Sequence, residues 1–143
     1  MKIKVLLITI TFLLVGKVVA QERQLEKADT KFNNWAYIDA IEIYEKVADK
    51  GFKSQELFQK LGDAYYFNSD FEKAYKWYNQ LMQLKTTTIT AEHYYRYAQT
   101  LKAVGKLQQA TAMLQKFKAL SENDIRSNLL SKNTNYLDLI KDN

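Results

Sequence analysis

The sequence predicts an all-α protein, a solenoid of three helical hairpins followed by a short C-terminal capping helix. Two adjoining parts of residues 57–85 carry apolar residues at helical spacing, which predicts two amphipathic helices joined by a tight turn. The pattern of the second helix recurs once before and once after this hairpin. One hairpin cannot bury both faces of its helices, so three units are the usual minimum for a stacked array.

The central hairpin has a small residue on each of its two helices. Its first apolar face consists of Phe58, Leu61, Gly62 and Tyr65, and its second of Phe71, Ala74, Tyr78 and Leu81. A small residue on each helix lets two antiparallel backbones approach closely. An aromatic residue before L-G-x-x-Y, followed by A-x-x-x-Y, resembles the tetratricopeptide repeat (TPR). The resemblance implies a TPR-type α-solenoid.

Ala40, Ala74 and Ala110 set the register of the repeats. Each follows an aromatic residue or a leucine by three positions, and the alanines are 34 and 36 residues apart. The first separation is the length of a TPR, and the second implies an insertion in the linker 85–90. The expected repeats cover about 22–51, 54–86 and 90–120, which gives six helices.

Local signals mark the ends of these helices. Ser54 and Asp70 are the expected N-caps of the two central helices, because their side-chain oxygens can accept hydrogen bonds from free backbone N–H groups. Gly51 is expected to close the first hairpin in a left-handed conformation, and Gly105 is expected to make the turn of the third.

Residues 121–143 are expected to form the capping helix and a tail. Ser121 with Asp124 is a variant of the capping box, and Asn133 to Asn135 should end the helix. The end of the tail, Tyr136 to Ile140, is apolar, whereas chain ends are usually polar and mobile. These residues either dock on the domain or link it to a downstream domain that this sequence does not include.

Residues 1–20 have the pattern of a secretory signal peptide. Two lysines precede an apolar run from Val5 to Gly16, and small residues end at Ala20. The apolar run is too short for a membrane-spanning helix, which needs roughly 20 residues. We therefore expect cleavage after Ala20, export to the periplasm, and no transmembrane segment in the mature chain.

Charge and composition exclude several classes of function. The formal charge of +5 includes three lysines of the first twenty residues, so the mature chain carries +2. The other lysines alternate with carboxylates along helical faces, which indicates a solvated surface rather than a nucleic-acid interface. There is no cysteine, one histidine (His93), and no metal, phosphate-loop or catalytic-triad motif. We expect no enzyme activity, no cofactor and no metal.

Most of the aromatic residues are expected in the core, namely Phe58, Tyr65, Phe71, Tyr78, Tyr94 and Tyr97. Another face of each first helix is expected to line the concave side of the solenoid and to hold a peptide or partner helix. These predicted groove residues are Gln59, Asp63, Tyr66 and Phe67 in the second repeat and Tyr95, Arg96, Gln99 and Lys102 in the third. The alternative is an ordinary solvated surface or a contact with a following domain.

Three runs resemble a narrower family. Residues 37–47 (YIDAIEIYEKV), 56–66 (ELFQKLGDAYY) and 95–105 (YRYAQTLKAVG) are similar to the N-terminal repeat region of OmpA-family envelope proteins from bacteria with type IX secretion. Residues 135–140 (NYLDLI) resemble the link from that region into a β-propeller. The resemblance covers essentially the whole chain and implies a scaffold at the outer membrane. No propeller or OmpA domain is present, so peptidoglycan binding is not carried over to any residue here.

Two alternative functions remain, of which we expect the first. The first is a non-catalytic periplasmic scaffold that binds a protein or peptide partner in the concave groove during envelope or secretion-machinery assembly. The second is a structural spacer that packs only against neighbouring domains of a larger OmpA-family protein. A clamp for a C-terminal carboxylate would need lysine and asparagine in the groove, where Gln59, Asp63 and Glu92 stand instead.

Overall fold

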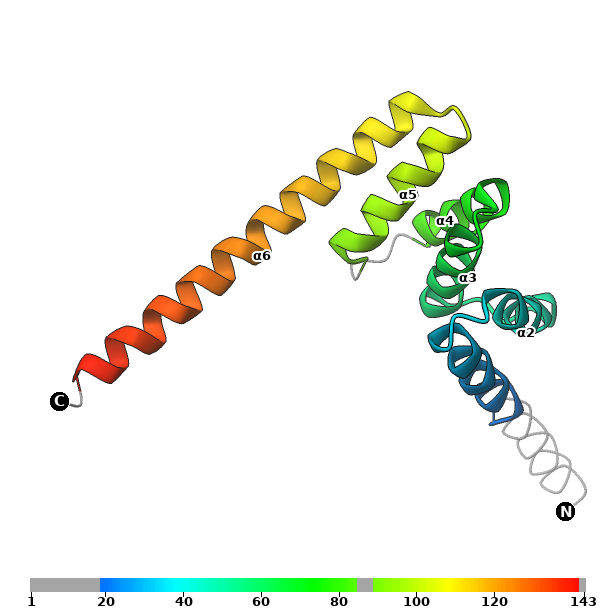
Figure 1. Ribbon diagram of the computed structural model, residues 1–143, viewed down its shortest axis with the longest axis horizontal. Coiled ribbons are helices and arrows are strands. Elements are labelled where there is room, and N and C mark those ends of the chain that lie inside the picture. Colours follow the sequence, from blue (N-terminus) through cyan, green and yellow to red (C-terminus); the bar gives the residue numbers. More distant parts are fainter. Residues whose placement is uncertain (1–18, 85–88, 142–143) are drawn as a thin grey trace, which may run out of the picture. The chain divides into compact units, whose positions relative to one another are not determined.

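The computed structural model describes residues 19–84 and 89–141, with side chains described up to residue 125 (Figure 1). In these ranges there are six helices and no strand. They are a helix over residues 19–33, α2 (Tyr37–Asp49), α3 (Gln55–Phe67), α4 (Phe71–Gln83), α5 (Ala91–Ala103) and α6 (Leu107–Lys141). The chain forms two compact units, divided between Leu84 and Lys85, and each is described by itself.

The predicted signal peptide lies outside the described residues except for Val19 and Ala20, which begin the helix over 19–33. None of the helices in the described part of the chain combines the length and the apolar character needed to cross a membrane.

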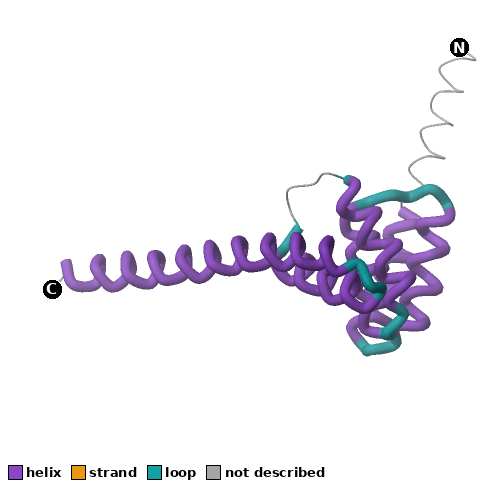
Figure 2. The backbone as a smooth tube through the Cα atoms, turned by 90° about the horizontal axis from the view of Figure 1, so that it is seen from above, coloured by secondary structure: helices purple, strands orange, loops and turns teal. Residues whose placement is uncertain are grey.

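Unit 1 contains the helix over 19–33 and α2 to α4, which follow one another as packed helical neighbours (Figure 1). Figure 2 shows the same helices joined by short loops. Their inward faces carry the residues that are least exposed, including Ala40, Tyr44, Val47, Leu57, Leu61, Ala74, Tyr78 and Leu81. The apolar faces predicted for the central hairpin therefore form the core of unit 1.

The close approach of α3 to α4 depends on Gly62. A Cβ atom added to this glycine would lie 2.5 Å from Cε1 of Tyr78, closer than real Cβ contacts come. The prediction that a small residue is needed here is confirmed, although the glycine faces the ring of Tyr78. Ala28 and Ala98 stand at the corresponding places of the other repeats, and both are fully buried.

The predicted caps and turns are confirmed. Leu57 N–H donates to Ser54 Oγ at 3.1 Å, and Lys73 N–H donates to Asp70 Oδ1 at 3.2 Å. Gly51 and Gly105 adopt positive φ angles of 86° and 77°. Glycine takes these angles without the steric cost that a Cβ would add.

Unit 2 consists of α5 and α6, which pack against each other as a hairpin. The separate capping helix expected after Leu120 does not occur, because α6 continues without a break through Asn133 to Lys141. No glycine or proline lies in this helix to interrupt it. Ser121, the expected cap, donates its hydroxyl to the carbonyl of Phe117 at 2.9 Å in the middle of the helix.

The aromatic residues predicted for the core are mostly buried. Phe58, Tyr65, Tyr78 and Tyr97 expose less than a tenth of their surface. Phe71 and Tyr94 are half-buried. The side chains of Tyr136 to Ile140 lie outside the part of the chain described at side-chain level.

Candidate functional site

The four predicted groove residues of α3 have different surroundings. Asp63 is only 7% exposed, and the hydroxyl of Tyr78 donates to its Oδ1 at 2.6 Å, so this carboxylate is committed to the interior of the hairpin. Gln59 and Tyr66 are half-buried, and Phe67 is 41% exposed. Gln59, Tyr66 and Phe67 thus keep surface that a partner could contact.

The aromatic pair Tyr66 and Phe67 belongs to a larger cluster. Phe67 stacks on Tyr37 with ring centroids 5.3 Å apart and an interplanar angle of 17°. Tyr66 contacts Phe67 and Phe71 edge to face, at 5.5 and 5.9 Å. The cluster ties the end of α3 to the starts of α2 and α4, which holds these rings in fixed positions.

The four predicted groove residues of α5 are more accessible. Tyr95 is 41% exposed and lies against Phe117 of α6, with ring centroids 5.3 Å apart. Lys102 is exposed and Gln99 is half-buried. The guanidinium of Arg96 pairs with Glu92 one turn earlier, and only 15% of its side chain is exposed.

The predicted groove joins residues of two units. The four from α3 lie in unit 1 and the four from α5 lie in unit 2. Within each unit the structure brings its own set together along one helix. A single groove formed by all eight residues stays a prediction.

Tyrosine hydroxyls donate to carboxylates between successive helices of unit 1. Tyr44 donates to Asp29 at 2.5 Å and Tyr65 to Glu45 at 2.7 Å, in addition to the pair of Tyr78 with Asp63. Tyr44 and Tyr78 occupy equivalent places, as do Asp29 and Asp63. Burial, followed by the hydrogen bond to Asp29, raises the pKa of Tyr44 well above its ordinary value.

These hydrogen bonds give the tyrosine hydroxyls a structural role, because each one joins a helix to the helix before it. The pKa of Tyr65 is likewise raised by burial and by its hydrogen bond to Glu45. A tyrosine with a raised pKa stays protonated at neutral pH, so it donates a hydrogen bond and does not act as a base. The third repeat has Gln99 and Leu114 at these places and lacks such a pair.

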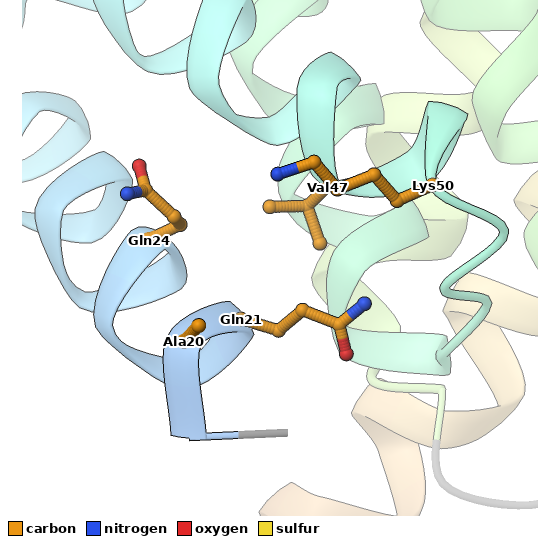
Figure 3. Close-up of a pocket in the computed structure, with 5 residues that line it drawn as sticks. All are labelled: Ala20, Gln21, Gln24, Val47 and Lys50. Atoms are coloured by element: carbon orange, nitrogen blue, oxygen red, sulfur yellow. The ribbon is translucent and has the colours of Figure 1, made fainter. Parts of the chain in front are cut away.

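A pocket of about 480 Å³ lies between the helix over 19–33 and α2 (Figure 3). Its lining residues are Ala20, Gln21, Gln24, Val47 and Lys50, and Figure 3 shows the side chain of Gln21 reaching toward α2. The lining offers one cation and two amides, without a nucleophile or carboxylate. One wall is Ala20, the residue after which cleavage is predicted, so we assign the pocket no function.

The described residues contain no group of three or more His, Cys, Asp or Glu side chains placed to hold a metal ion. His93 lies at the start of α5, where its Nδ1 is 2.7 Å from Thr90 Oγ1. This contact joins the imidazole to the residue just before the helix.

Comparisons with known proteins agree with the repeat architecture. The family described as "Anaphase-promoting complex, cyclosome, subunit 3", which is TPR-like, matches residues 33–117, more than half of the chain. The chain belongs to this TPR-like family. No curated protein matches it.

Solved structures with the same fold include other TPR proteins. The C-terminal part of a TPR repeat-containing protein from Cytophaga hutchinsonii matches with a TM-score of 0.63 and 22% identity, over 69% of this chain and 39% of that one. TPR-like repeats of a putative kinesin light chain from Podosopora anserina match with a TM-score of 0.53 and 21% identity, over 74% of this chain and 57% of that one. The chain therefore spans between a third and three fifths of these structures, and at such identities the likeness shows the TPR fold alone.

The TPR register makes the turns of the three hairpins directly comparable. Trp35, Ser69 and Gly105 stand at the same place, with φ angles of 65°, 61° and 77°. In each turn, the N–H of this residue donates to the carbonyl three positions earlier at 3.0 to 3.1 Å. The next N–H donates to the carbonyl five positions earlier at 2.8 to 3.0 Å, which completes a Schellman motif.

Trp35 was not identified from the sequence as a surface residue of interest. It is 80% exposed, in a turn position where glycine or another small residue is favoured, and Ile38 nearby is 69% exposed. Apolar spacing alone does not locate the left-handed position of a turn. Trp35 therefore stands out in the sequence only after the three turns have been aligned in the repeat register.

Proposed function

We propose that this TPR protein is a non-catalytic scaffold that binds a protein or peptide partner in the periplasm, in association with the outer membrane. Its role there is the assembly of the cell envelope or of a secretion machinery. The TPR fold generally mediates contacts between proteins. The pattern of residues 1–20 and the resemblance to OmpA-family envelope proteins support the location.

The observation that supports the binding role is the mixture of aromatic and polar side chains on α3 in unit 1 and, separately, on α5 in unit 2. Phe67 and Tyr95 each expose 41% of their surface, and Lys102 is exposed beside Gln99. Aromatic side chains supply contact area at a low cost in conformational entropy, while the polar ones fix orientation. This combination is suited to a helix or an extended peptide.

A pull-down from envelope extracts tests the groove. The variant Tyr66→Ala with Arg96→Glu removes a half-buried ring and reverses one charge, and partners of the wild-type protein should be lost from it. The matched control changes Glu42 and Lys46 to alanine, an exposed pair on α2 whose loss should change neither folding nor binding. Retention of the same partners by the groove variant would rule out the groove.

Cell fractionation and N-terminal sequencing test the location. We expect the mature protein in the periplasmic and outer-membrane fractions, beginning at Gln21. A cytoplasmic protein that retains Met1 would contradict this part of the proposal and would leave the binding surface to be judged separately.

The absence of catalysis belongs to the same proposal. TPR-like families are generally non-catalytic, and the groove residues offer no nucleophile activated by a base. A purified chain that turned over a substrate and lost that activity on changing His93 to alanine would overturn it.

A structural spacer is the alternative, and the length of α6 favours it. With 35 residues, α6 is about 52 Å long, whereas its partner α5 has 13 residues and is about 20 Å long. Much of α6 therefore extends past α5 and could hold neighbouring domains apart. Gene sequence downstream of Asn143 would decide this, because a spacer requires a following domain to separate.

A further inference from the structure

The turn of the first repeat forms a small surface that the fold does not require. We call it the turn patch and define it as Trp35, Tyr37, Ile38 and Asp39. Together with Ala36 and Asn68, these residues line a pocket of about 280 Å³. The patch contains none of the eight predicted groove residues.

Comparison with the other two turns shows how unusual the patch is. Where the first repeat has Trp35, Ala36 and Ile38, the second has serine, aspartate and glutamate, and the third has glycine, lysine and glutamine. The three turns nevertheless share the same backbone hydrogen bonds. Since polar side chains support the same turn twice in this chain, the apolar ones are not needed for folding.

Two of these residues also work against local stability. Trp35 carries a bulky side chain at a positive φ of 65°, a conformation that non-glycine residues rarely adopt. Ala36 precedes α2 without any side-chain cap, whereas Asp70 caps α4 at the same place. An exposed apolar surface maintained at a local cost indicates a contact with another molecule.

The floor of the patch is held in place. The ring of Tyr37 stacks on Phe67, and Phe32 meets both rings edge to face at 5.3 and 6.0 Å. Because a rigid aromatic surface loses little conformational entropy on binding, it can serve as an anchor point.

Charge identifies the kind of occupant. Asp39 lines the pocket with a side chain that is 56% exposed, at a place where the other repeats have lysine and glutamine. Its ion pair with Lys31 is also exposed, and such pairs contribute little. A carboxylate beside an exposed indole ring favours a cation, since an arginine or lysine can pair with the one and stack on the other.

We propose that the turn patch docks a segment of another protein that presents an arginine or lysine next to an apolar residue. The apolar residue would contact Trp35 and Ile38, and the cation would reach Asp39. A second copy of the chain is a poor fit, because a stable dimer buries roughly 20 to 30 residues on each side and the patch is a single turn.

A random peptide library displayed on phage tests the proposal. The wild-type protein is the bait, and the counter-selection uses a turn-swapped variant with Trp35→Ser, Ala36→Asp and Ile38→Glu, the residues of the second repeat. Selected peptides should carry arginine or lysine beside an aliphatic or aromatic residue. Their affinity for the turn-swapped variant should be lower by about tenfold or more.

Three controls keep this test separate from misfolding. The turn-swapped variant gives α2 the aspartate cap that α4 has, and it puts a smaller side chain at the positive φ of position 35. Its urea midpoint should therefore equal or exceed that of the wild type. Asp39→Asn alone should lower the affinity for the basic peptides by about threefold to tenfold. It should not change the affinity for derivatives of these peptides that lack the arginine or lysine. Glu72→Ile places an isoleucine in the second turn and should gain no binding.

Several outcomes would overturn the proposal. These are a selection in which no peptide prefers the wild type, enrichment of acidic residues, or binding to phospholipid vesicles that the swap removes. If the wild type self-associates in sedimentation and the turn swap abolishes this, the occupant of the turn patch is a second copy of the chain and not a basic segment of another protein. The groove residues are unchanged in all these variants, so the result does not depend on the proposed groove.

Discussion

Gly62 of α3 lies so close to the ring of Tyr78 of α4 that no Cβ atom fits between them. The ring of Tyr78 is fully buried, and its hydroxyl is bonded to Asp63, so the ring has little room to move away from a new methyl group. Close packing of this kind transmits a small change in volume directly into a loss of stability.

Changing Gly62 to alanine should therefore destabilise the protein. We expect overpacking to cost about 1 to 3 kcal/mol in the free energy of unfolding, of which the better helix propensity of alanine offsets up to about 1 kcal/mol. Urea titration followed by circular dichroism measures the net loss. The same substitution in a Tyr78→Leu background, with the residue found at Leu114 in the third repeat, should cost less because the ring is absent. Equal costs in the two backgrounds would show that the ring does not oppose the methyl group.

Tyr44 and Tyr65 predict how stability depends on alkaline pH. Their pKa values are raised in the folded state, first by burial and then by hydrogen bonds to carboxylates. Below pH about 10 both the folded and the unfolded chain keep these protons, and the full stabilisation is present. Above that pH the unfolded chain binds fewer protons than the folded chain, so stability falls as pH rises.

Unfolding by urea at a series of pH values checks this sign. The midpoint should decrease above pH about 10, and Tyr44→Phe should make the decrease less steep because one of the linked protons is gone. A variant whose pH profile is parallel to that of the wild type would mean that Tyr44 titrates equally in both states.

At the scale of elements, the helix ends were largely predictable and the end of the third hairpin was not. Ser54 and Asp70 cap their helices as expected because capping is a local interaction within a few residues. The expected stop after Leu120 was wrong, since loss of the repeat pattern does not end a helix. Without glycine or proline, the backbone hydrogen bonds of α6 simply continue.

A proline at position 121 tests the continuity of α6. Ser121→Pro removes a backbone donor and its ring clashes with the preceding turn, which costs about 3 kcal/mol in a helix interior. Far-ultraviolet circular dichroism should show a clear loss of helix, while Ser121→Ala should keep or increase the signal. Unchanged helicity in the proline variant would indicate that a helix boundary already lies at this residue.

At the scale of the whole molecule, the fully buried side chains among the described residues of unit 1 all follow the predicted cleavage site. Val19 and Ala20 are exposed, and the first fully buried side chain of the described residues is that of Ala28. Buried area rather than position along the chain decides whether a terminal segment contributes to stability.

Removal of residues 1–20 should leave the domain intact. The free energy of unfolding of the shortened chain should agree with that of the full chain within about 0.5 kcal/mol, as for changes at exposed sites. Matched urea curves in mild detergent would make the comparison. A shortened chain that unfolds at a clearly lower midpoint would show that the leader residues pack on the domain.

The sequence by itself determined the all-α class, the TPR register and most of the core, because apolar spacing and small residues at helix crossings are local and periodic. Tertiary structure alone decided that Asp63 is buried against Tyr78, that α6 runs on to Lys141, and that Trp35 occupies a left-handed turn position with its indole in solvent. The burial of Asp63 depends on the side chain that a neighbouring helix presents, and the turn at Trp35 depends on backbone angles. The length of α6 depends on where the backbone hydrogen bonds stop, and the end of the repeat pattern does not mark that point.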